Sequence, residues 1–295
     1  MLVIAGLSWG TAGTLGALLS AGTGLPFLAV ASYRILVGGV LTLAFVLVTR
    51  GARWPRTASG WRRVFAVGLS SAAYQITYFS AVGIVGVSIA TLITIGSAPV
   101  IVAVVDVFTG RHRLDTRLLV TLAVALLGIG LLAGAPPPGI GAGELALGVL
   151  LSLAAGSAFA NISLLGARPV SDFHDATGTA LAFLVGGSTV MVLAAATGPV
   201  LWTPTASTVA LAIALGLIPS TVAYLAYFRG LRTQTSTTGA LVTLLEPITG
   251  MILAAVILGE RIGMVGALGA ACLLTSVALA ATGGSAPAEA EASLQ

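Results

Sequence analysis

Long apolar stretches recur along the whole chain and leave little sequence between them. Each has about 18 to 23 residues, enough for a helix that rises 1.5 Å per residue to cross a hydrocarbon core of about 30 Å. Of the 295 residues, 57% are hydrophobic and 7% are charged, whereas a soluble domain has roughly 25% charged residues. The sequence therefore predicts an all-α integral membrane protein with ten transmembrane helices, at 1–19, 27–49, 63–84, 88–109, 117–134, 144–167, 175–197, 206–228, 236–258 and 262–283.

The basic residues are distributed unequally between the two predicted sides of the membrane. Cytoplasmic loops carry an excess of basic residues, so the richer side predicts the cytoplasm and places both termini there, in a multi-pass protein of the cell (inner) membrane. The dispersed arginines do not form a nucleic-acid surface. Glu260, beside Arg261 in a predicted outer loop, is interpreted as a helix-end group. Eleven of the thirteen basic residues are on the richer side: Arg50, Arg53, Arg56, Arg62, Arg63, Arg111, Arg113, Arg117, Arg168, Arg229 and Arg232.

The two halves of the sequence resemble each other at an offset of about 150 residues. "AAYQITYFSAVG" (72–83) matches "VAYLAYFRGL" (222–231), and "SAPVIVAVVDVFTG" (97–110) matches "LEPITGMILAAVILG" (245–259) with one extra residue between proline and glycine. Five helices per unit make the second unit inverted relative to the first. Inverted repeats are common in secondary transporters, whose substrate site lies near the midplane. A duplicated bundle without a cavity is the alternative.

Glu246 is a carboxylate inside an apolar span. It lies eleven residues into the predicted helix 236–258, about 15 Å deep by the helical rise, and its side chain is too short to reach the interface. Inserting the ionised carboxylate at this depth would cost roughly 2.5–3.5 kcal/mol of free energy. We expect either a role in substrate binding or coupling in a polar cavity, or a hydrogen bond between helices. Ser236, Gly239 and Thr243 share its helix face.

Arg34 lies about seven residues into the predicted helix 27–49. As a cavity cation it would bind a substrate carboxylate or pair with Glu246. As an interfacial anchor its long side chain would reach the membrane surface. Both interpretations stay open on the sequence alone.

Pro99 and Pro247 occupy matching positions in the two halves. A proline inside a helix removes one intrahelical hydrogen bond and kinks the helix, which is tolerated at membrane depth where protein or cavity water satisfies the freed carbonyl. We expect these kinks to act as hinges or to line a cavity. Static kinks that only shape the packing are the alternative.

Tyrosines and one asparagine complete the candidate site. Ser71, Tyr74 and Tyr78 share one helix face, and Tyr224 follows the same pattern in the second half. Tyr74 and Tyr78 lie too deep for the interfacial aromatic belt, so we expect them to line the cavity. Asn161 is expected to hydrogen-bond either a substrate or another helix.

The sequence carries no motif for catalysis or nucleotide hydrolysis. The two histidines, His112 and His174, fall in predicted loops, Cys272 is the single cysteine, and a phosphate loop of the G-x-x-x-x-G-K type is missing. We predict no enzyme activity, no cofactor and no metal, with a small-molecule substrate and the lipid bilayer as partners. The alternative function is a non-transporting membrane scaffold or sensor.

Several short motifs, in order, resemble the EamA-type members of the drug/metabolite transporter superfamily. They are "WG" (Trp9, Gly10), Arg34, a tyrosine followed by "AP", then "AY", "EP" and "LGE". The resemblance implies two EamA-like repeats around a central cavity and export of amino acids or related metabolites. Its motif positions include Tyr74, Pro99, Tyr224, Glu246 and Pro247.

The resemblance divides the chain into a first repeat at 1–134, a linker at 135–143 and a second repeat at 144–283. The small and acidic residues of the tail at 284–295 predict disorder. The sequence departs from the family pattern at two places. "GRHRL" (110–114) replaces the usual glycine-glutamate, and Phe159 replaces a tryptophan.

Overall fold

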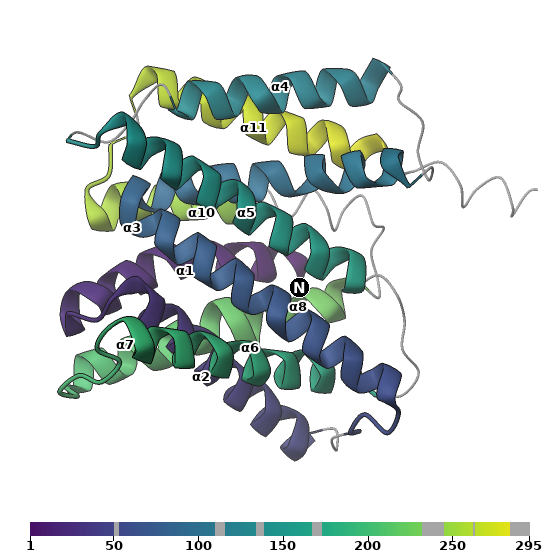
Figure 1. Ribbon diagram of the computed structural model, residues 1–295, viewed down its shortest axis with the longest axis vertical. Helices are drawn as coiled ribbons and strands as arrows, with labels where there is room; N and C mark the ends of the chain where they lie inside the picture. Colours follow the sequence, from purple (N-terminus) through teal and green to yellow (C-terminus); the bar gives the residue numbers. More distant parts are fainter. Residues whose placement is uncertain are drawn as a thin grey trace, which may run out of the picture.

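The computed structural model is built of helices (Figure 1). It describes residues 1–49, 53–109, 116–133, 139–166, 173–231, 245–261 and 263–283, and these ranges contain no β-strand. The elements are α1 (Leu2–Thr23), α2 (Phe27–Thr49), α3 (Ala58–Phe108), α4 (Thr116–Ala133), α5 (Ala142–Gly166), α6 (Asp175–Thr197), α7 (Ala206–Gly216), η1 (Leu217–Val222), α8 (Ala223–Leu231), α10 (Leu245–Leu253), η2 (Ala254–Leu258) and α11 (Met264–Gly283).

Much of this helical structure is apolar enough to lie within a membrane. Among the described residues, six helices can cross one by length and composition: Leu2–Thr23, Phe27–Thr49, Ala58–Val102, Ala142–Ile162, Ala176–Thr197 and Ala206–Tyr227. Shorter apolar helices cover Thr116–Leu132, Leu245–Leu258 and Met264–Leu279. The predicted class, an all-α membrane protein, is confirmed. The count of ten spans and their inverted arrangement stay predictions.

The long helix α3 contains a break at Gly86. At 51 residues an unbroken helix would be about 75 Å long, more than twice the hydrocarbon thickness of a bilayer. Gly86 has φ 81° and ψ 168°, a backbone region that is essentially restricted to glycine. The two segments run in different directions in Figure 1. The break falls between the predicted spans 63–84 and 88–109, while the first segment starts earlier than predicted, at Ala58.

Glu260 caps the helical segment that begins after this break. The backbone N–H of Val87 donates to Oε1 of Glu260 at 2.7 Å, and that of Ser88 donates to Oε2 at 2.9 Å. The first N–H groups of a helix have no partner within the helix, and a carboxylate also favours the positive end of the helix dipole. The expected helix-end role of Glu260 is confirmed, at the start of a helix distant in sequence.

Helix α1 is the central element of the bundle. It contacts α2, α3, α7, η1, α8, α10 and η2. Around it, α3 packs on α5, α2 packs on α6, and α4 packs on α11, the last two lying side by side at the top of Figure 1. The main hydrophobic cluster includes Leu19 of α1 and Phe79 of α3 together with Leu215 of α7 and Leu273 of α11. The core therefore lies between helices from both halves of the sequence.

Helices α1 and α10 approach closely at Gly10. A Cβ atom at this position would lie 2.5 Å from Cβ of Thr249 and 2.7 Å from the backbone oxygen of Glu246. A side chain larger than hydrogen would push the two helices apart. The "WG" dipeptide thus brings the backbone of α1 against the turn of α10 that carries Glu246.

Two π-helical stretches lie in the second half of the sequence, η1 at Leu217–Val222 and η2 at Ala254–Leu258. η1 carries Ser220 and leads directly into α8, which carries Tyr224. η2 lies between Pro247 and Gly259, where the second half has one residue more than the first. A π-helical turn accommodates a single added residue within a helix, so η2 fits this difference in spacing.

Substitution of Gly86 by alanine tests the break in α3. The added Cβ would lie 2.9 Å from Oε1 of Glu260, and the backbone conformation costs a residue other than glycine about 1–3 kcal/mol. We expect the Gly86→Ala variant to melt several degrees lower in detergent. Gly130→Ala in α4 is the control, because nothing lies within 4 Å of its added Cβ. A Gly86→Ala variant as stable as the control would contradict the strained break.

Candidate functional site

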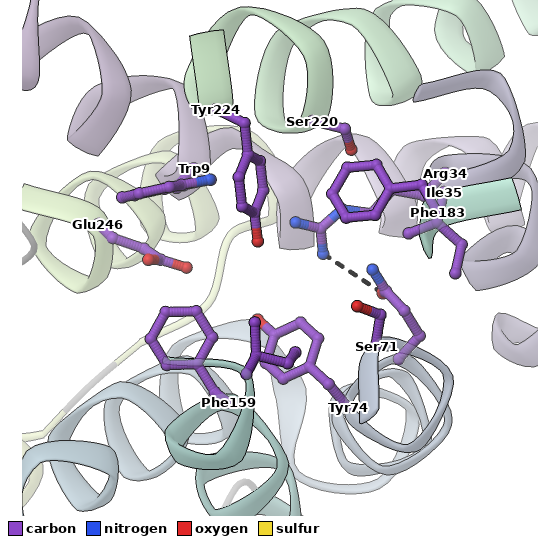
Figure 2. Close-up of a pocket in the computed structure, with 12 residues that line it drawn as sticks. Trp9, Arg34, Ile35, Ser71, Tyr74, Phe159, Phe183, Ser220, Tyr224 and Glu246 are labelled. Carbon is purple, nitrogen blue, oxygen red and sulfur yellow. Dashed lines mark hydrogen bonds between the residues drawn. The ribbon is translucent and has the colours of Figure 1, made fainter. Parts of the chain in front are cut away.

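Eight of the helical elements contribute side chains to one buried pocket (Figure 2). These side chains come from both halves of the sequence. Tyr74 of α3 lies on the same pocket as its sequence counterpart Tyr224, and a nearby serine accompanies each of them, Ser71 and Ser220. The lining consists of Trp9, Arg34, Ile35, Ser71, Tyr74, Gln75, Phe159, Ile162, Phe183, Ser220, Tyr224 and Glu246.

The pocket is small in this structure. Its free volume is about 20 Å³. One water molecule needs at least about 10–15 Å³ of such space. The lining side chains therefore leave space for one or two water molecules.

Arg34 and Glu246 are the two charged side chains in this lining. Arg34 is 4% exposed and Glu246 is 6% exposed. They extend into the pocket from opposite sides in Figure 2, with the hydroxyl of Tyr224 between them in this view. Within the described part of the chain neither forms an ion pair. The predicted cavity positions of both groups agree with this arrangement, whereas a direct Arg34–Glu246 pair is not formed.

The guanidinium of Arg34 is only partly satisfied. Nη1 donates to Oε1 of Gln75 at 3.4 Å, a long hydrogen bond. The Phe79 ring lies below the cation, 5.9 Å from Cζ to the ring centroid, within the range of a cation–π contact. Nε is buried and has no hydrogen-bond partner among the described residues. Arg34 does not act as an interfacial anchor here, because its side chain is enclosed by protein.

Aromatic rings form the walls around the charged groups. Tyr224 packs edge-on against Trp9 at 5.5 Å and against Phe183 at 5.1 Å between ring centroids. Tyr74 makes a tilted contact with Phe159 at 5.8 Å. Edge-to-face and offset contacts of this kind hold ring orientations. These ring contacts therefore hold the hydroxyl-bearing rings of Tyr74 and Tyr224 in place.

Tyr78 lies directly behind Tyr74 and does not line the pocket itself. The two rings stack with 5.6 Å between centroids and 3° between planes. The Tyr78 hydroxyl shares a buried hydrogen bond of 2.8 Å with Oγ1 of Thr91. Tyr78 therefore joins the two segments of α3 and supports the wall that Tyr74 provides.

The remaining predicted residues lie elsewhere. Asn161 is exposed, does not line the pocket, and donates from Nδ2 to Oγ of Ser70 at 2.8 Å, which corresponds to the expected contact between helices. Pro247 is buried in α10 beside Glu246. At Pro99 the helix α3 continues, and its side chain is outside the described residues. Ser236, Gly239 and Thr243 are also outside them.

The sequence reasoning missed Gln75, Ile35, Ile162 and Phe183 as pocket residues, and it noted Trp9 and Phe159 only as motif positions. A usable signal existed for Gln75, which lies four residues after Ser71 and three before Tyr78, on the helix face already identified. No such signal existed for the others, because an apolar side chain that faces a pocket looks in sequence like one that faces lipid.

Comparison with known proteins agrees with the fold. The model of the EamA-like transporter family matches residues 1–134 and 146–282. The "Uncharacterized transporter YwfM" of Bacillus subtilis (strain 168) is 27% identical over 274 residues, which cover 92% of this chain and 90% of that protein. A crystal structure with 22% identity covers 94% of this chain and 93% of its own, with a TM-score of 0.63.

The fold and the two family matches define this chain as a multi-pass α-helical membrane transporter. The chain belongs to the EamA-like transporter family. The resemblance inferred from the ordered motifs is confirmed. The likeness to the crystal structure, at 22% identity, concerns the fold alone.

The Tyr78–Thr91 hydrogen bond can be tested by a double-mutant cycle. Tyr78→Phe and Thr91→Val each leave a buried hydroxyl without its partner, which costs about 1–3 kcal/mol, whereas removing both hydroxyls is nearly neutral. We expect the double variant to melt at a higher temperature than the sum of the single effects predicts. Additive shifts in the melting temperature in detergent would show that the two hydroxyls are not coupled.

Proposed function

We propose that the protein is a secondary transporter that exports a small polar metabolite, such as an amino acid, by alternating access. The observation that carries this proposal is the pair of opposite charges, Arg34 and Glu246, buried in one pocket without an ion pair in the described part of the chain. Burying an unpaired charge costs several kcal/mol. A chain that needed only packing at these positions would gain stability from apolar side chains.

A zwitterion would satisfy both groups at once. Its carboxylate would accept hydrogen bonds from the guanidinium of Arg34, and its ammonium would donate to the carboxylate of Glu246. Charge-assisted hydrogen bonds are among the strongest in proteins, and guanidinium matches the fork of a carboxylate. The aromatic walls and the hydroxyls of Tyr74 and Tyr224 would contact the rest of the substrate.

The proposed transport cycle uses two inverted five-helix repeats, residues 1–134 and 144–283, joined by a linker at 135–143. Two observations support it: the family model matches two segments of the chain, and the Ser71–Tyr74 and Ser220–Tyr224 pairs line the same pocket. In an inverted repeat, the halves exchange conformations, which opens a central site to alternate sides of the membrane. A pocket with room for one or two waters corresponds to a closed step of such a cycle.

Counterflow in proteoliposomes tests this function. The purified protein is screened for exchange of each proteinogenic amino acid, and Glu246→Gln and Arg34→Gln are compared with the unmodified protein. We expect each variant to lose about tenfold or more of its transport, because a charge-assisted hydrogen bond of about 1.5–3 kcal/mol is lost.

Matched controls lie outside the pocket. Glu144→Gln changes an exposed carboxylate at the start of α5, and Arg53→Gln changes an exposed guanidinium; both should transport normally. Undiminished transport by a folded Glu246→Gln variant would remove Glu246 from the mechanism. Failure of the unmodified, folded protein to exchange any compound would favour a membrane scaffold or sensor.

The proposal places the protein in the cell (inner) membrane with both termini in the cytoplasm, as the distribution of arginines indicates. Single cysteines test this in a Cys272→Ser background. An impermeant maleimide added to intact cells should label Thr203→Cys, between α6 and α7, and should label Ser59→Cys, at the start of α3, only after lysis. Both native residues are exposed. The reverse labelling pattern would invert the topology.

A further inference from the structure

The partner of Arg34 in the pocket is a neutral amide. Gln75 is 3% exposed, and its Oε1 accepts from Nη1 of Arg34 at 3.4 Å, drawn as the dashed line in Figure 2. A guanidinium has five N–H donors and no acceptor, so the oxygen end of the amide is the one that must face it. This hydrogen bond orients the guanidinium, and because the amide is neutral, it leaves the positive charge of Arg34 uncompensated.

The rest of the environment leaves that charge available. Arg34 has no ion pair within the described part of the chain, and its Nε has no hydrogen-bond partner there. The Phe79 ring supports the cation through its face but supplies no lone pair. The NH2 group of Gln75, on the amide that contacts Arg34, adds two further N–H donors. The guanidinium of Arg34 and the amide of Gln75 therefore both place N–H donors at the same end of the pocket.

We infer that Gln75 is a positioning and selectivity residue, which orients Arg34 and keeps its positive charge uncompensated for the carboxylate of the substrate. A glutamate at this position would form an internal ion pair with Arg34 and occupy the donors that the substrate needs. An apolar residue would leave the guanidinium without its hydrogen bond. The amide meets both requirements, because its oxygen accepts a hydrogen bond from Arg34 and it carries no charge. This inference rests on the proposed binding of a zwitterion between Arg34 and Glu246.

The charge balance of the pocket makes a selectivity prediction. With Gln75 the lining carries one cation and one carboxylate, which suits a zwitterion. The Gln75→Glu substitution replaces one amide NH2 by an oxygen, adds almost no volume, and gives the lining a net negative charge. That lining should favour a ligand with an ammonium and no carboxylate, such as the primary amide of an amino acid.

Binding of two matched probes tests the inference. The probes are the amino acid that exchanges best in the counterflow screen and its primary amide, titrated against the unmodified protein, Gln75→Glu and Gln75→Leu in detergent. The unmodified protein should bind the acid more tightly. Gln75→Glu should weaken binding of the acid about ten- to hundredfold and reverse the preference in favour of the amide. Gln75→Leu should weaken the acid less and keep the order of preference.

The ligand-free melting temperature separates this role from a structural one. Gln75→Glu should melt no lower than the unmodified protein, because the new carboxylate gains Arg34 as a partner. Unchanged preference for the acid in a stable Gln75→Glu variant would overturn the role of Gln75 and leave the proposed transport intact. Failure of every amino acid to bind the unmodified protein would overturn both, and transport of another class of compound would then identify the substrate.

Discussion

The structure depends on how a membrane protein holds two opposite charges apart inside an apolar bundle. Arg34 and Glu246 are both almost fully buried, in a medium where an unpaired ion is unstable and its partners are few. The protein does not bring them together. It surrounds them with aromatic rings, one amide and a few hydroxyls, and the amide of Gln75 accepts a hydrogen bond from Arg34. A pocket of this kind is stable only because many helices enclose it.

The enclosure draws on both halves of the chain. Gly10 lets α1 lie against the backbone of Glu246, while Tyr74 and its counterpart Tyr224 line the same space, together with Ser71 and Ser220. The π-helical stretch η1 carries Ser220 and leads directly into the helix of Tyr224. A π-helical turn changes the direction of the side chains that follow it relative to an α-helical turn, so η1 sets how Ser220 and Tyr224 are placed relative to each other.

Much of the architecture could be predicted from the sequence, because long apolar spans, deep ionisable residues and a repeated tyrosine pattern each have few physical explanations. Arg34, Tyr74, Tyr224 and Glu246 were identified in this way and lie on one pocket. The same reasoning could not decide the role of Asn161, because its amide can hydrogen-bond a substrate as well as a residue of another helix such as Ser70. The apolar lining was not predictable either, because hydrophobicity does not distinguish a wall of the pocket from a surface that faces lipid.

The carboxylates of Glu246 and Glu260 differ in how far they are enclosed by protein. Glu260 is half-buried and caps the helical segment after Gly86, and it joins parts of the chain that the family model matches separately. Dissolved ions screen a half-buried group more strongly than one enclosed in a closed pocket. Raised ionic strength therefore weakens the contact of Glu260 with the helix N-terminus more than it screens Glu246 while the pocket is closed.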